Sequence, residues 1–332
     1  LGGMARRLQT TLEGVDVQGY LKELVAQVYR HPLIHVSHGA RITDSSGYVG
    51  NFTTTVEAEG RVKEIKHGAT ILATGSVEHR PAEYLYGEDP RVCTQLELEE
   101  RLAAGADESR RVVMIQCVGC REEGRDYCAR ICCSQAIKNA LTLKAKDPEV
   151  DISILYRDMR TYGFKEDYYR EAADQGVRFV RWEPEGRPEV APGKDETGKD
   201  VLQVTVPDAI LGQRLALDAD MVVLSVAAVP SQGNPEVARL FKVPVNPDGF
   251  FQEAHVKLRP VDFGADGVFM CGANHYPKHL SETVSQAYGA AGRAVTILSQ
   301  ETVTASGSVC EVNELALSLI HISEPTRPIL VS

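Results

Sequence analysis

Residues 111–146, RVVMIQCVGCREEGRDYCARICCSQAIKNALTLKAK, combine a strand pattern, a loop and a helix pattern. The apolar run at 112–115 predicts a buried strand, and apolar residues at helical spacing within 134–146 predict a helix. A strand, a tight turn and a helix open a dinucleotide-binding unit, whose turn is normally rich in glycine. In this turn the chain instead carries five of its eight cysteines: Cys117, Cys120, Cys128, Cys132 and Cys133.

The segments after this stretch continue the alternation of strand and helix. We expect strands at 151–157 and 177–184, a helix at 165–176 between them, and a further strand at 221–227. A hairpin-like stretch, 202–220, precedes that last strand. Strands that alternate with crossover helices form a parallel sheet. The sequence therefore predicts an α/β fold with a Rossmann-like domain in this region.

Length and charge limit the classes of function. A chain of 332 residues can bury a large core and has room for about two domains. It carries 36 basic and 46 acidic residues, a net charge of −10, which disfavours broad binding to nucleic acid or anionic membranes. No apolar run has the length of a transmembrane segment. We expect a cytoplasmic protein, with clustered cysteines that point to metal or redox chemistry.

The first third of the chain predicts a helix followed by a β-meander. Residues 17–30 have apolar side chains at helical spacing, and 33–72 read mostly as strand. Turn residues at 44–47 and 59–60 are expected to separate the strands.

Two strand ends resemble the recurrent signatures of flavoprotein disulfide-reductase-like folds. The strand within 67–75 ends in Ala-Thr-Gly, and the strand within 266–273 ends in Gly-Ala. In that family the first marks where the chain leaves the FAD domain, and the second marks its return. A helix follows, with Ser281 as the expected N-cap. Its N-terminus would present N–H groups and positive potential to a reduced flavin.

The resemblance to flavoproteins implies a set of FAD-binding positions. A Gly-Gly pair near the start of the chain matches the pair that follows the ribose-binding acidic residue in this family, although the glycine loop upstream of it is absent. We therefore expect the chain as given to bind FAD weakly or not at all. The expected FAD-binding residues are Gly2, Gly3, Ala73, Thr74, Gly75, Gly272, Ala273, Glu282 and Thr283.

The cysteine spacing predicts a four-sulfur site. If 127–134 is helical, Cys128 and Cys132 share one face and Cys133 lies about 100° round the helix. Cys117, at the strand end, could complete a cage suited to an iron–sulfur cluster. Two other interpretations stay open: a zinc site made of four cysteines, and a redox-active disulfide between Cys117 and Cys120. Cys93, Cys271 and Cys310 stand alone and are expected to be inert.

Three segments together resemble the A subunit of heterodisulfide reductase and its relatives. They are 112–141, 154–185 and 249–287, and the resemblance extends over roughly 1–314. It implies an electron-transfer protein with FAD and a [4Fe-4S] cluster, the cluster being held by Cys117, Cys128, Cys132 and Cys133. Cys120 departs from the family pattern, in which serine is usual. The resemblance also implies partner subunits and an electron donor, and it assigns no catalytic acid, base or nucleophile.

The resulting domain prediction is a discontinuous FAD-binding domain with an insertion. Residues 1–105 form its first part, 106–245 form an inserted Rossmann-like domain with the cysteine cluster, and 246–300 return to the FAD domain. Residues 301–332 are expected to be a linker and a non-native tail. Alternative functions are an NAD(P)H-dependent disulfide reductase that uses Cys117 and Cys120, or a zinc-stapled scaffold.

Five further residues are weaker candidates. His275 and Lys278 lie in the loop before the last helix and could approach the flavin. Arg157, Arg160 and Tyr162 lie in another loop and could face a partner or the cluster.

Overall fold

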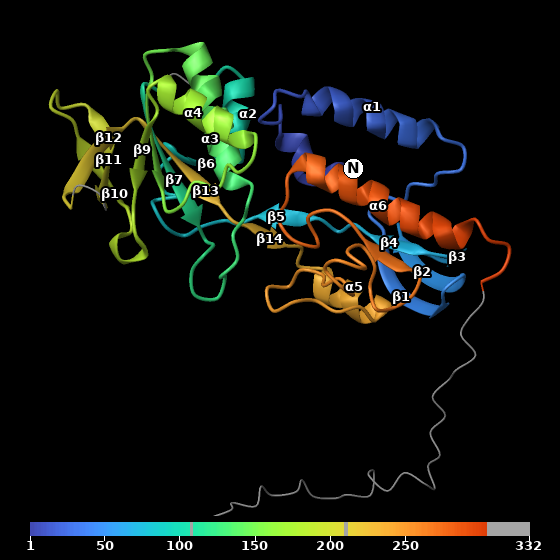
Figure 1. Ribbon diagram of the computed structural model, residues 1–332. Coiled ribbons are helices and arrows are strands. Elements are labelled where there is room, and N and C mark those ends of the chain that lie inside the picture. Colours follow the sequence, from blue (N-terminus) through green and yellow to red (C-terminus); the bar gives the residue numbers. More distant parts are fainter. Residues whose placement is uncertain (107–108, 209–211, 304–332) are drawn as a thin grey trace, which may run out of the picture.

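The structure is a computed structural model that describes residues 1–106, 109–208 and 212–303. Two lobes are joined by a two-stranded connection (Figure 1). In this connection β5 (Ser76–Glu78) pairs antiparallel with β14 (Ala228–Pro230). One strand leads out of the first lobe and the other leads back, so the second lobe is inserted into the first.

The inserted lobe is built on a five-stranded parallel sheet with the order β6-β13-β7-β8-β9. Its strands are β6 (Val92–Thr94), β7 (Arg111–Val118), β8 (Asp151–Tyr156), β9 (Arg178–Arg181) and β13 (Met221–Val226). The crossover helices are α3 (Cys132–Lys146) and α4 (Lys165–Asp174), and α2 (Gln95–Ala103) follows β6. This arrangement confirms the predicted α/β fold with a parallel sheet.

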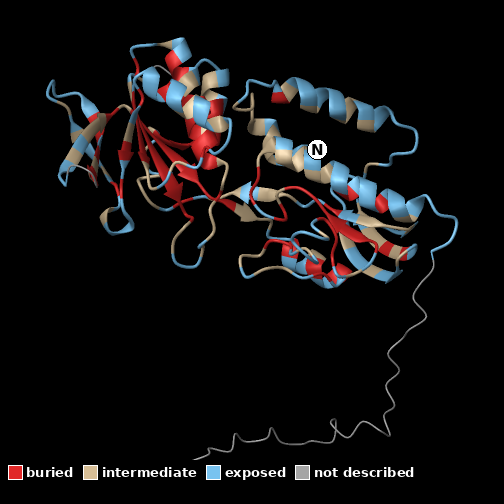
Figure 2. Ribbon diagram, in the orientation of Figure 1, coloured by how far each residue is buried: buried red, intermediate tan, exposed pale blue. Residues whose placement is uncertain are grey.

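Both faces of the parallel sheet are covered, which explains why its strands have no polar side. Val112 and Met114 of β7 pack with residues of the helices, such as Ile137. Val113 and Ile115, which point to the opposite face, pack with residues of an antiparallel meander. That meander consists of β10 (Glu189–Lys194), β11 (Asp200–Pro207) and β12 (Arg214–Ala219), and η2 (Pro184–Gly186) precedes it. Figure 2 shows the resulting buried core of the lobe.

The other lobe contains the chain start and the last helix. It begins with η1 (Gly3–Arg7) and the predicted helix α1 (Val17–Arg30). The meander is formed by β1 (Arg41–Tyr48), β2 (Asn51–Ala58) and β3 (Arg61–His67). Next, β4 (Thr70–Leu72) pairs in parallel with β15 (Val268–Met270), and α5 (Asn234–Phe241) and α6 (Leu280–Leu298) complete the lobe. Among the described helices, none combines the length and the apolar character that crossing a bilayer needs.

Three local predictions are wrong. The expected turn at 44–47 lies inside β1, whose Gly47 pairs with Phe52, and the chain turns only after Tyr48. The last helix begins at Leu280 and has His279, not Ser281, as its N-cap. Residues 127–131 are not helical, because Arg130 adopts a positive φ of 61° and α3 begins only at Cys132.

The predicted domain boundaries remain predictions. Strand pairing and packing indicate where the chain passes from one lobe to the other. β6 joins the parallel sheet, and α2 packs on it, although both precede 106. Residues of α5, which precede 246, pack with Phe263 and Val268 of the first lobe. Boundaries close to β5 and β14 would match these contacts. Cys310 and most of the predicted tail lie outside the described residues.

Candidate functional site

The cysteine loop, residues 117–133, carries five thiols, and its two ends bring four of them together. Cys117 lies at the end of β7 with a φ of 65°, and Cys120 follows after a turn at Gly119. A short hairpin then returns the chain: the N–H of Arg121 donates to the carbonyl of Tyr127 at 3.1 Å. Cys132 and Cys133 form the first two positions of α3.

Four of these thiols are fully buried in one cluster. Cys117, Cys120, Cys132 and Cys133 have exposed fractions of 8%, 1%, 2% and 2%, and they contact one another together with alanine side chains. Cys128 is only half-buried. All five are free thiols.

The thiols interact in pairs, and cationic groups lie beside them. The hydrogen bond from the Cys120 thiol lowers the pKa of Cys117, and the guanidinium of Arg121, whose Nη1 lies 3.9 Å from the Cys117 sulfur, lowers it further. In the same way, the Cys132 thiol lowers the pKa of Cys133. The backbone N–H of Arg130 donates to the sulfur of Cys128 at 3.3 Å. The environment therefore stabilises the thiolates of Cys117 and Cys133, and a thiolate is the form that binds metal. The hydrogen bonds with these two residues, together with burial, raise the pKa of their partners Cys120 and Cys132.

Unsatisfied polar groups flank the thiols. Gln116 is completely buried and neither atom of its amide has a hydrogen-bond partner in the described part of the chain. The buried hydroxyl of Ser134 also lacks a partner there, and no side chain caps the N-terminus of α3. Buried polar groups normally find a partner. The thiol donors, the free helix N-terminus and these groups all fit a bound iron–sulfur cluster.

A site for a single metal ion would need a different arrangement of ligands from a four-iron cluster. Within residues 1–106, 109–208 and 212–303, no three His, Cys, Asp or Glu side chains are arranged to hold one metal ion. A cluster with four iron atoms is bound through one thiolate per iron, so its ligands need not converge on one point.

The two signature turns lie side by side in the first lobe, because β4 and β15 are neighbours. Gly75 and Gly272 have φ values of 72° and 86°, which favour glycine. The amide of Asn274 donates to the carbonyl of Leu72 at 2.9 Å and so ties the second turn to the first strand. The other amide atom of Asn274 and the hydroxyl of Ser76 are buried without a partner among the described residues. These free polar groups beside both turns fit a bound cofactor.

The start of α6 meets the second turn. The methyl group of Thr283 lies 3.5 Å from where a Cβ on Gly272 would be. The carboxylate of Glu282 accepts the N–H of His279 at 2.9 Å, which closes a capping box at this helix start. The structure thus brings Gly272, Ala273, Glu282 and Thr283 together with the Ala73–Gly75 turn. Gly2 lies apart from this group in the chain and packs against Leu21 of α1, while Gly3 opens η1.

The weaker candidates in the loop before α6 are buried. Lys278 donates to the carbonyl of Gly272 at 2.9 Å, and burial lowers the pKa of this lysine to about 8. His275 bonds to Glu253 at 2.8 Å. Both side chains therefore support the second turn.

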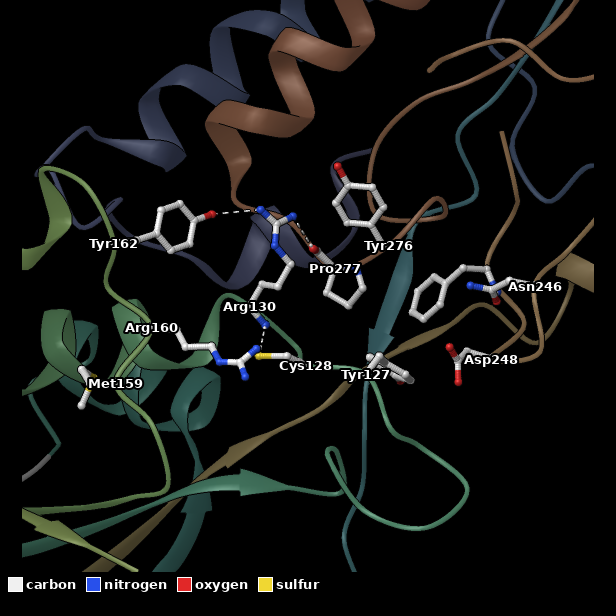
Figure 3. A pocket seen from close by; sticks show the side chains of 11 residues that line it. Tyr127, Cys128, Arg130, Met159, Arg160, Tyr162, Asn246, Asp248, Tyr276 and Pro277 are labelled. Atoms are coloured by element: carbon white, nitrogen blue, oxygen red, sulfur yellow. Dashed lines mark hydrogen bonds between the residues drawn. The ribbon is translucent and has the colours of Figure 1, made fainter. Parts of the chain in front are cut away.

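A cleft of about 590 Å³ lies beside the cysteine loop (Figure 3). Its walls come from both lobes: Tyr127, Cys128, Arg130, Met159, Arg160, Tyr162, Asn246, Asp248, Phe250, Tyr276 and Pro277. Of the candidates in the second loop, Arg160 and Tyr162 line the cleft. Arg157 instead donates to the carbonyl of Arg121 at 2.7 Å.

Arg130 is a candidate site residue that the sequence analysis did not single out. Its guanidinium donates to Glu282 at 2.8 Å, to the hydroxyl of Tyr162 at 2.9 Å and to the carbonyl of Pro277 at 3.3 Å. It therefore connects the cysteine loop directly to the start of α6. Its place as a basic residue between cysteines is a signal in the sequence. Its partners could not be predicted, because they lie far away in the sequence.

Comparison with known proteins finds relatives in sequence and solved structures that are similar in fold. No family model matches the chain. The A subunit of ferredoxin:CoB-CoM heterodisulfide reductase from Methanosarcina acetivorans is 35% identical over 299 residues, covering 76% of this chain and 36% of the relative. The iron–sulfur A subunit of CoB–CoM heterodisulfide reductase from Methanocaldococcus jannaschii is 41% identical over 253 residues, covering 70% and 37%.

Among solved structures, thioredoxin reductase from T. acidophilum has the same fold. The TM-score is 0.57 at 13% identity, and the match covers 90% of this chain and 88% of that one. The chain spans only 36–37% of the length of these two sequence relatives. Over the matched region, the chain belongs to the heterodisulfide reductase A-subunit family.

Proposed function

We propose that this chain is a FAD- and iron–sulfur-binding oxidoreductase segment of a heterodisulfide reductase-type complex in the cytoplasm. In this proposal it passes electrons between the flavin, a [4Fe-4S] cluster, partner subunits and an electron donor. The observation that carries the proposal is the link made by Arg130. This side chain joins the loop that carries five thiols to the helix start beside both flavoprotein signatures.

Cys117, Cys128, Cys132 and Cys133 would hold the cluster. Burial of three of these thiols excludes water, and the nearby Arg121 and the N-terminus of α3 offset the negative charge of a cluster with four thiolates. When bound, the cluster would supply one-electron steps beside the two-electron chemistry of a flavin.

The two signature turns would hold the flavin. Ala73, Thr74 and Gly75 form one wall, and Gly272 and Ala273 the other. Thr74 is itself held, because its hydroxyl donates to Asn234 at 2.7 Å. Glu282 and Thr283 would orient the ring from the start of α6, while Gly2 and Gly3 would lie toward the dinucleotide.

The cluster assignment is tested by separate alanine substitutions of Cys117, Cys132 and Cys133. Each should abolish the cluster spectrum of anaerobically reconstituted protein or convert it to a species with less iron, because each removes one ligand. Cys93→Ala is the matched control, since Cys93 is equally buried but lies beside Met221 in the parallel sheet. Equal iron in the control and in all three variants would reject the assignment.

The flavin assignment is tested by Ala273→Leu in a longer chain that carries the glycine loop expected upstream of Gly2. The larger side chain would occupy the space beside the second turn, and we expect FAD affinity to fall by about tenfold or more. Ala291→Leu, at an exposed position of α6, should leave affinity unchanged. Unchanged FAD affinity in Ala273→Leu would remove this turn from the flavin site.

One observation favours a second candidate function. Cys117 and Cys120 lie within hydrogen-bonding contact, as the cysteines of an NAD(P)H-dependent disulfide reductase would. That candidate requires stoichiometric NADPH binding, and it requires a Cys117–Cys120 disulfide that NADPH reduces. Isothermal titration with NADPH separates it from the electron-transfer proposal, which predicts no binding by the inserted lobe.

A further inference from the structure

The cysteine loop has one thiol more than a four-iron cluster needs. This inference rests on the proposed cluster and concerns its fourth ligand. Three thiols lie on regular secondary structure: Cys117 lies at the end of β7, and Cys132 and Cys133 begin α3. The remaining two, Cys120 and Cys128, differ in burial but lie at the two ends of one hairpin.

The hairpin at 121–127 places Cys120 and Cys128 at its two ends. The N–H of Arg121 donates to the carbonyl of Tyr127 at 3.1 Å. Glu122 and Arg125 exchange two backbone hydrogen bonds, of 3.2 and 3.0 Å. The residues directly outside these pairs are Cys120 and Cys128, so the two cysteines lie at the open end of the same hairpin.

The two thiols face different surroundings. Cys120 is 1% exposed, is hydrogen-bonded to Cys117 and belongs to the same buried cluster as Cys132 and Cys133. Cys128 is half-buried and lines the cleft, where its sulfur lies close to Arg130 (Figure 3).

We propose that Cys120 and Cys128 are interchangeable ligands of the same cluster corner. In the exchange, the Cys120 thiol gives up its proton and bonds to the iron. The bond between iron and Cys128 breaks, and the released thiolate takes up a proton. No electrons are gained or lost. The exchange leaves the cluster with four ligands and exposes a free Cys128 thiol to the cleft.

Iron analysis of single and double variants tests the exchange. Cys120→Ser and Cys128→Ser should each retain about four iron atoms per chain after anaerobic reconstitution, because the other thiol takes the corner. The double variant should lose at least one iron, with an electron paramagnetic resonance signal that changes to that of a three-iron species. Cys93→Ser serves as the control for loss of a buried thiol outside the loop.

Thiol labelling gives an independent readout. In the reconstituted protein, iodoacetamide should alkylate Cys128 while iron content stays constant, and mass spectrometry locates the label. Cys120→Ser should protect Cys128 severalfold, because Cys128 is then needed as the ligand.

The outcomes separate this inference from the proposed function. Iron that is kept by the wild type but lost equally in Cys128→Ser and in the double variant would overturn the exchange alone. Labelling of Cys128 that does not change in Cys120→Ser would overturn it too. A wild-type chain that takes up no iron would overturn the proposed function, and the exchange with it.

Discussion

The guanidinium of Arg130 lies 2.8 Å from the carboxylate of Glu282, although 152 residues separate them in the chain. Arg130 belongs to the cysteine loop and Glu282 to the first turn of α6, so this ion pair crosses between the two lobes. The same carboxylate group accepts the N–H of His279. Glu282 therefore has two roles, one as helix cap and one as partner of the cysteine loop.

The substitutions Glu282→Gln and Glu282→Ala should separate these two roles. Glu282→Gln keeps an acceptor for the cap but loses the ion pair, and we expect the free energy of unfolding to fall by less than about 1 kcal/mol. Glu282→Ala loses the cap as well and should cost about 1 kcal/mol more. Urea denaturation of both variants measures the difference. Equal costs would mean that the cap contributes nothing.

A buried ion pair holds the start of the chain against the inserted lobe. Nζ of Lys138 lies 2.6 Å from Glu99, and the two side chains are 9% and 5% exposed. Glu99 also accepts the N–H of Gln9 at 2.6 Å. Lys138→Met leaves the Glu99 carboxylate buried without its cation, which should cost about 3–5 kcal/mol of unfolding free energy.

The exposed pair of Arg170 and Glu166 on α4 provides the control for that measurement. Arg170→Met should cost under about 1 kcal/mol. Adding Glu99→Gln to Lys138→Met should recover part of the lost stability, because the unpaired charge is then removed. A double variant as unstable as the sum of both single variants would contradict this account.

Gly119 is required by close packing in the cysteine loop. A Cβ at this position would lie 2.3 Å from Cδ2 of His79, and the φ of Gly119 is 71°. Gly124, in the same loop, has a φ of 80° but no atom within 4 Å of the corresponding Cβ. Both alanine substitutions carry backbone strain, whereas only Gly119→Ala adds the clash with His79, at about 1–3 kcal/mol more. Thermal denaturation compares them, and equal melting temperatures would disprove the role of His79.

Lys278 should make stability depend on pH. Burial lowers its pKa from 10.5 to about 8, so between these values the unfolded chain binds more protons than the folded one. Stability contributed by this residue therefore rises as the pH increases from 8 to 10.5. Lys278→Met removes that contribution. The difference in unfolding free energy between wild type and variant should shift in favour of the wild type across this range, and a constant difference would refute the pKa shift.

Sequence patterns predicted the parallel sheet because its physical cause is local. The apolar run that forms β7 reflects burial on both faces, and the helix pattern after it reflects one face packed on the sheet. The prediction of a turn at 44–47 failed because Asp-Ser-Ser-Gly has turn composition, yet pairing with β2 determines its structure. Composition cannot reveal such pairing.

The candidate site was only partly predictable for a similar reason. Cysteine spacing identified the loop, but the helix expected at Cys128 is interrupted by the positive φ of Arg130. Asn246, Asp248 and Phe250 of the cleft carry no sequence signal, because only the return of the chain to the first lobe brings them to the cysteine loop.

The central claim is that the cysteine loop holds an iron–sulfur cluster, and metal analysis tests it most directly. After anaerobic reconstitution with iron and sulfide, we predict about four iron atoms and four acid-labile sulfides per chain, with broad charge-transfer absorption that dithionite bleaches. About one zinc atom per chain without labile sulfide would contradict the account and favour a structural zinc site.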